Sequence, residues 1–61
     1  MANLLEIREK QKLHLLSLLR IKSLNPGVEI KGLQEEIVTA IAPMEHEDIA
    51  WVEKLTNVKA V

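Results

Sequence analysis

The chain has 61 residues, a net charge of −1 and no cysteine, which excludes disulfides and thiolate metal sites. So short a chain makes a single domain, predicted over residues 1–61, and it buries only about 60% of the surface that its unfolded form exposes. Such domains usually gain stability from a disulfide, a metal or a partner subunit. Because the chain cannot form disulfides, a partner subunit is a candidate source of this added stability.

The apolar residues are almost all aliphatic, with ten Leu, six Ile, five Val and Trp51 as the only aromatic residue. Two Gly and two Pro are too few for a turn-rich β domain, and a leucine-rich composition favours helix. No run of about 20 apolar residues offers a membrane span, and the segment from Met1 lacks the basic-then-apolar pattern of a signal peptide. We therefore expect a small, soluble, cytoplasmic, all-α domain.

The first helix is predicted over about residues 4–23, with Asn3 as its N-cap. One broad face of it carries six leucines, which are Leu4, Leu5, Leu15, Leu16, Leu18 and Leu19. Leu13, Ile21 and Leu24 lie on the opposite side. Because a helix that is apolar on two sides is usually covered on two sides, these three residues predict contact with something beyond the rest of the chain.

A loop is predicted over about residues 24–32, because Pro26 cannot continue the helix and Gly27 permits a positive φ. Val28–Lys31 alternates apolar and polar residues, which fits either an extended loop, the interpretation we prefer, or a very short strand. A lone strand would need a second chain to complete its hydrogen bonds. A second helix is then predicted over about residues 33–42, with an apolar stripe of Leu33, Ile37, Ala40 and Ile41.

The third helix is predicted over about residues 44–57, with Pro43 ending the second helix and opening the third. Its expected apolar stripe consists of Met44, Trp51, Leu55 and Val58, and Val52 and Ile49 extend it. We expect Trp51 in the core, and the alternative is that it anchors an interface. Val58 and Val61 predict a C-terminal end that docks on the domain.

Residues capable of chemistry are sparse, and their spacing predicts neither an enzyme nor a cofactor or metal site. The only dense set of metal ligands is Glu45-His46-Glu47-Asp48, and on a helix His46 points away from the pair formed by Glu45 and Asp48. No Ser or Thr has a neighbouring base in an activating pattern. Three short helices of aliphatic residues also leave little room for a pocket of about 300 Å³.

The charge is unevenly divided along the chain. Residues 1–31 carry six basic and three acidic side chains, whereas residues 32–61 carry two basic and six acidic ones. We interpret this as two halves that pack together with complementary charge. The alternative is a nucleic-acid or other anionic partner that the first helix contacts through Arg8, Lys12, Arg20 and Lys22. A helix-turn-helix reading of the last two helices is disfavoured, because three carboxylates at the start of the third would repel phosphates.

These observations predict three helices, a long one and two shorter ones that fold back on it, within a homo-oligomeric bundle. A second copy of the chain, in a dimer, is the simplest cover for a self-association interface of Leu13, Ile21, Leu24 and Trp51. The predicted function is a non-catalytic protein–protein interaction or assembly module. The alternative function is a small nucleic-acid-binding regulator.

Overall fold

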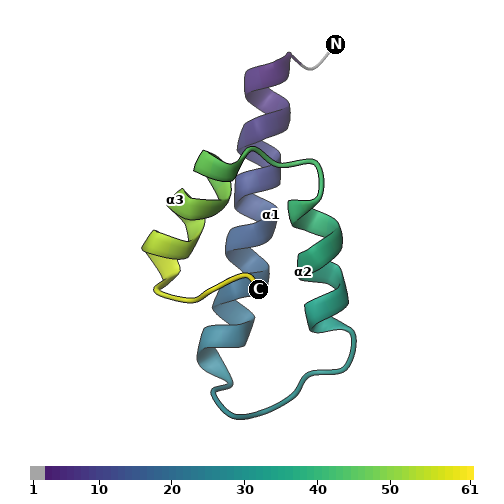
Figure 1. The fold of residues 1–61 in the computed structure, drawn as a ribbon, viewed down its shortest axis with the longest axis vertical. Helices are drawn as coiled ribbons and strands as arrows, with labels where there is room; N and C mark the ends of the chain where they lie inside the picture. The colour runs from purple at the N-terminus through teal and green to yellow at the C-terminus, as the bar shows by residue number, and fades with distance from the viewer. Residues whose placement is uncertain (1–2) are drawn as a thin grey trace.

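The computed structural model describes residues 3–61, so residues 1–2, with which the predicted domain begins, lie outside this description. Three helices occupy the described residues: α1 (Leu4–Leu24), α2 (Leu33–Ile41) and α3 (His46–Thr56). The two shorter helices pack side by side on one face of α1, and the C-terminal segment returns between them (Figure 1). The prediction of an all-α fold with a long first helix is confirmed, and residues 3–61 contain no strand.

Capping residues set the limits of α1. The Oδ1 atom of Asn3 accepts a hydrogen bond of 2.8 Å from the backbone N–H of Glu6, which satisfies one of the free donors of the first turn. At the other end the side chain of Asn25 donates to the carbonyl of Ile21 over 2.8 Å. Gly27 then takes a φ of 75°, a value that glycine adopts without strain.

The loop from α1 to α2 contains Val28–Lys31 without regular secondary structure, in agreement with the loop interpretation. Gly32 precedes α2 with a φ of 81°, where a side chain would be strained although no neighbouring atom fills the space. Glu35 and Glu36 lie in the first turn of α2. Their carboxylates interact favourably with the positive end of the helix dipole.

The third helix begins later than the predicted position near residue 44. Pro43 lies in a turn and does not open α3, and the backbone N–H of Met44 donates to the carbonyl of Ile41 over 3.0 Å. This turn buries Met44 and leaves Glu45 as the N-cap residue of α3. The helix ends at Thr56, followed by Asn57 with a positive φ of 57°.

The core consists of aliphatic side chains from α1, α2, α3 and the C-terminal segment. Its buried members are Leu15, Leu18, Leu19, Ile37, Met44, Val52 and Ala60. Full burial of a leucine or valine side chain contributes about 2 kcal/mol to stability. The middle of α1 therefore supplies the surface on which α2 and α3 are held.

The expected core position of Trp51 is wrong. The Trp51 side chain is 49% exposed and Leu55 is exposed beside it, while Val52 is fully buried. The side of α3 that faces α1 carries Asp48 and Val52, with Ile49 packed against the same core. Val52 and Ile49, which extend the predicted stripe, are thus buried or packed on the core beside Asp48. The carboxylate of Asp48 pairs with Arg8, while Trp51 and Leu55 stay outside.

The C-terminal segment docks as predicted, through Val58 but not through Val61. Ala60 is fully buried, Val58 is half-buried and packs against the core, and Val61 is exposed. The backbone of Ala60 makes two hydrogen bonds: its carbonyl accepts from Gln34 Nε2 over 2.8 Å, and its N–H donates to Glu53 Oε2 over 2.7 Å. Polar contacts to the backbone therefore hold this end together with the apolar contacts of Val58 and Ala60.

We expect the substitution Leu19→Ala to lower the free energy of unfolding by about 3 kcal/mol, because it removes a fully buried side chain and leaves a cavity. Urea denaturation followed by circular dichroism measures this loss. Leu4→Ala serves as the control, since Leu4 is exposed and its truncation should change stability by less than about 0.5 kcal/mol. Equal losses for both variants would contradict this description of the core.

Candidate functional site

The three apolar residues predicted to need a cover on α1 are exposed. Leu13 is 59%, Ile21 41% and Leu24 79% exposed. At about 100° per residue they lie on one side of α1, within about 80° of one another. Ile21 lines a groove between α1 and α2, whereas Leu24 lines a hollow beside α3. The structure thus presents two hollows, one on each flank of the side of α1 that carries these residues.

The first surface lies where α1 runs beside α3, and we call it the α1–α3 surface. Its apolar members beside α3 are Leu16, Leu24, Trp51 and Leu55, and we include the exposed Leu13, which lies within about 60° of Leu16 and Leu24 on α1. Leu16, Leu24 and Leu55 line a hollow of about 350 Å³ together with Arg20, Ser23 and Thr56. At the other end of the α1–α3 surface, outside this hollow, the Nζ atom of Lys12 lies 5.0 Å from the centre of the Trp51 ring, a cation–π distance.

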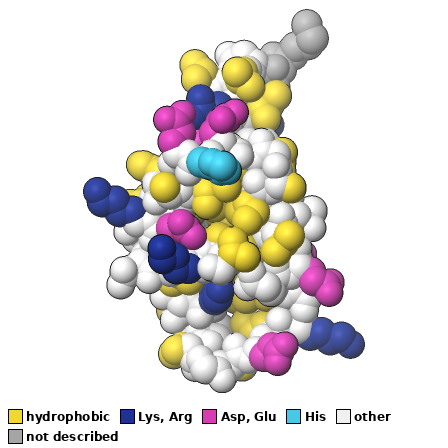
Figure 2. All heavy atoms as spheres, viewed as in Figure 1, with side chains coloured by type: hydrophobic (Ala, Val, Ile, Leu, Met, Phe, Trp, Pro, Cys, Tyr) yellow, Lys and Arg dark blue, Asp and Glu magenta, His cyan; other side chains and the backbone are white. Residues whose placement is uncertain are grey.

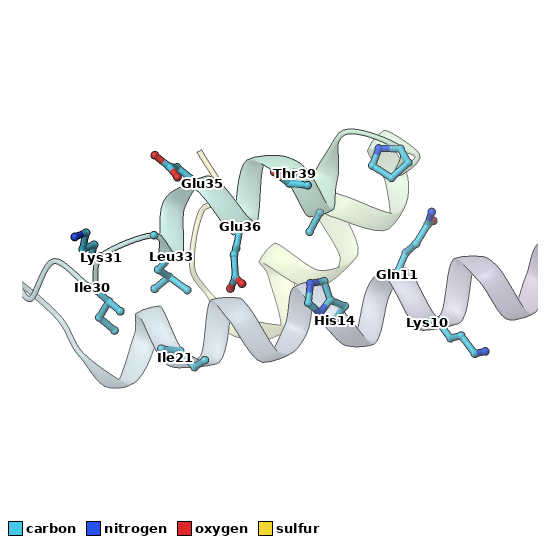
Figure 3. A pocket seen from close by; sticks show the side chains of 13 residues that line it. Lys10, Gln11, His14, Ile21, Ile30, Lys31, Leu33, Glu35, Glu36 and Thr39 are labelled. Atoms are coloured by element: carbon cyan, nitrogen blue, oxygen red, sulfur yellow. The ribbon is translucent and has the colours of Figure 1, made fainter.

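The second surface is the groove between α1 and α2, which has a volume of about 940 Å³. Figure 3 shows Ile21, Ile30 and Leu33 gathered at one end of it, while Glu36 points from α2 toward α1. The expectation that the helices leave little room for a pocket is wrong. The cause is the nine-residue length of α2, since Ala40 near its end and Pro43 in the turn that follows leave the flank of α1 uncovered.

The polar residues around the α1–α2 groove have mixed charge. Lys10 and Lys31 lie on its rim with Glu35 and Glu36, and His14 projects from α1. Within residues 3–61 no three His, Cys, Asp or Glu side chains come together as metal ligands. The groove therefore offers an apolar floor with a nearly neutral rim, which suits an apolar segment better than a small charged ligand.

Hydrophobic side chains also lie on the surface at the end where α1 begins (Figure 2). Leu4 and Leu5, which were assigned to the same broad leucine face of α1 as the core residues Leu15, Leu18 and Leu19, are both 70% exposed. The first turns of α1 extend past α2 and α3 in the described part of the chain (Figure 1). The apolar residues at this end consequently have nothing to pack on within residues 3–61.

Arg8 connects the start of α1 to the start of α3. Its Nε and Nη2 atoms each donate a 2.9 Å hydrogen bond to a different carboxylate oxygen of Asp48, and Nη2 also lies 2.9 Å from Glu47 Oε1. Asp48 is buried, and a buried carboxylate is tolerated when it is paired in this way. Hydrogen bonding to Arg8 lowers the pKa of Asp48, and the same contact raises the pKa of Arg8.

The other basic residues predicted to contact an anionic partner are engaged to different degrees. Lys12 pairs with Glu9 over 2.8 Å and lies over Trp51. The Nζ atom of Lys22 donates to the carbonyl of Lys59 over 3.1 Å and to Gln34 Oε1 over 3.3 Å. Arg20 is exposed and forms no ion pair within residues 3–61. Three of the four residues thus hold the helices together.

The sequence pattern did not identify the pair formed by Arg8 and Asp48, although the uneven division of charge along the chain predicted contacts of this kind. The basic first half and acidic second half were interpreted as surfaces of complementary charge, and this pair joins those halves. What the pattern left open was which carboxylate lies opposite which base. Forty residues separate Arg8 from Asp48, so only the packing of α3 on α1 brings them together.

Comparison with known protein families, with curated proteins and with solved structures finds no match to this chain. None of the helices within residues 3–61 is long and apolar enough to cross a membrane. Inferences about function therefore rest on the two surfaces and on the charges around them.

We expect Asp48→Asn to destabilise the fold at pH 7 and to have a smaller effect in acid. The pKa of Asp48 is lowered in the folded protein. Its ion pair therefore contributes fully above the pKa of the unfolded carboxyl, about 3.9, and this contribution is lost as the pH falls through the lower folded value. Urea denaturation at about pH 7 and about pH 2 measures the difference between wild type and variant.

Glu35→Gln is the control for this experiment, because Glu35 is an exposed carboxylate on α2. Its substitution should change stability by less than about 0.5 kcal/mol at neutral pH. A difference between wild type and Asp48→Asn that stays the same at both pH values would show that the charge of Asp48 does not stabilise the fold.

Proposed function

We propose that the protein is a small helical interaction module that assembles with copies of itself, as a dimer, and connects other proteins without catalysis of its own. One observation carries the proposal: the apolar residues of the α1–α3 surface stay exposed although the chain has folded its two short helices onto α1. Large exposed apolar areas on small proteins are typical of binding surfaces. A cytoplasmic location is part of the same proposal.

Two apolar surfaces support a module that both self-associates and binds a partner. The α1–α3 surface and the α1–α2 groove lie on opposite flanks of α1. A second copy that covers one flank leaves the other accessible. The groove, with Ile21, Ile30 and Leu33 on its floor, would then receive an apolar segment of a partner.

The nucleic-acid alternative receives less support from the contacts. Arg8, Lys12 and Lys22 interact with groups of the chain itself, which leaves Arg20 as the freest of the four predicted bases. A protein that neutralises several phosphates needs several available cations. The contacts of these bases therefore favour the interaction module over nucleic-acid binding.

We expect the mass measured by light scattering to rise with concentration toward twice the 6.9 kDa of one chain, between about 1 μM and about 1 mM. Leu13→Asp should hold the protein at the mass of one chain, because it places a charge on the exposed α1–α3 surface. Val38→Asp is the matched control, since Val38 is an exposed apolar residue on α2. A single-chain mass for the wild type at all concentrations would exclude self-association.

We also expect no retention of the protein on immobilised duplex DNA at about 100 mM salt, since the chain carries a net charge of −1 and three of the four predicted phosphate contacts interact with groups of the chain itself. Elution is measured against a rising salt gradient. Strong salt-dependent retention that disappears in the double variant Arg20→Glu/Lys22→Glu would favour the nucleic-acid function instead.

A further inference from the structure

The exposed side of α1 that borders α3 carries a regular stripe. At about 100° per residue, eight side chains fall within roughly 100° of the helix circumference. They are Leu5, Glu6, Glu9, Leu13, Leu16, Arg20, Ser23 and Leu24. Seven of them are exposed, and Leu16 is half-buried against the core. The four leucines, Glu9 and Arg20 recur at spacings of three or four residues and form a stripe that runs nearly the full length of α1, with Glu6 and Ser23 beside its two ends.

The order of these residues is self-complementary. Read from either end, the stripe consists, in order, of a leucine, a charged residue, two leucines, a residue of the opposite charge and a final leucine. If a second α1 packs antiparallel about a twofold axis, each residue of the stripe faces the residue that lies equally far from the opposite end of the partner's stripe. Leu5 then lies level with the partner's Leu24, and Leu13 lies level with the partner's Leu16.

Charge selects the antiparallel orientation. In that orientation each Glu9 faces the partner's Arg20, so the dimer gains two ion pairs between opposite charges. A parallel pair would instead place Glu9 against the partner's Glu9 and Arg20 against the partner's Arg20, which is repulsive. Arg20 forms no ion pair within residues 3–61, and Glu9 makes only an exposed contact with Lys12 three residues away. Arg20 is thus available, and Glu9 would exchange its contact with Lys12 for one with the partner's Arg20.

The third helix adds to the same surface. Leu55 lines the hollow of about 350 Å³ with Leu16, Arg20 and Leu24, and Trp51 lies farther along α3 beside Lys12. A second helix seated on the stripe would enter this hollow and cover part of the exposed ring of Trp51. An interface with an aromatic residue at its edge and leucines at its centre is typical of stable complexes.

We infer that two copies of the chain associate through antiparallel pairing of their α1 helices, with Leu13 and Leu16 at the centre and the Glu9–Arg20 ion pairs on both sides. The inference rests on the self-association proposed above, to which it adds the surface and the orientation. The twofold arrangement uses the same stripe on both copies, as closed dimers do. The α1–α2 groove stays outside this interface.

Charge reversal tests the pairing. Glu9→Arg and Arg20→Glu each place like charges opposite one another in the antiparallel dimer, and each should weaken dimerisation about tenfold or more. The double variant Glu9→Arg/Arg20→Glu restores opposite charges and should dimerise within about threefold of wild type. An equimolar mixture of the two single variants should also recover the dimer mass. Sedimentation equilibrium measures each dissociation constant, and circular dichroism checks that the helix content is unchanged.

Lys31→Glu is the matched control, because it reverses an exposed charge in the loop outside the stripe; it should leave the dissociation constant within about twofold. A wild-type dimer whose affinity is unaffected by both single reversals would overturn the antiparallel pairing and leave self-association standing. A wild type that stays at the single-chain mass would overturn both.

Cysteine crosslinking gives an independent readout, since the chain has no cysteine of its own. Glu9→Cys and Arg20→Cys chains mixed under oxidising conditions should form a disulfide between unlike chains, while either variant alone should remain largely uncrosslinked. Efficient crosslinking of Glu9→Cys to itself would indicate a parallel pair and overturn the inference.

Discussion

The packing of both short helices on a single row of leucines in α1 is the constraint from which the rest of the structure follows. Leu15, Leu18 and Leu19 face α2 and α3 at the same time, and each short helix packs mainly on α1. With 21 residues α1 is about 31 Å long, whereas α2 and α3 measure about 13 Å and 16 Å. Two such helices cover the middle of one face, so the ends and the back of α1 stay in contact with solvent.

Polar contacts determine how the two short helices sit on that row. Arg8 fixes the start of α3 through Asp48, and Gln34 and Glu53 hold the C-terminal segment over the gap between α2 and α3. The charged contacts link segments that lie far apart in the sequence, whereas the leucines give little preference for one rotation of α3 over another. The carboxylate of Asp48 thus selects the face of α3 that is buried, and Trp51 and Leu55 are left outside.

The periodicity of the sequence was sufficient to predict the three helices, because capping residues and Pro or Gly mark their ends. It also identified Leu13, Ile21 and Leu24 as residues that the chain does not cover. It failed in α3 for Trp51, which is exposed, and for Asp48, which is buried, since periodicity does not register an ion pair with Arg8. Nor could it separate Ile21 from Leu24, because the sides of α1 become distinct only when α2 and α3 occupy different flanks.

The place of Trp51 also determines what an optical signal from this protein reports. It is the only aromatic residue of the chain, and its ring lies half exposed beside the ammonium group of Lys12 rather than among the core leucines. Its fluorescence emission therefore responds to events at the flank of α1 and α3, such as the arrival of another helix or loss of the Lys12 contact. Disruption of the distant packing around Ile37 would leave the indole in a similar polar environment and change its emission far less.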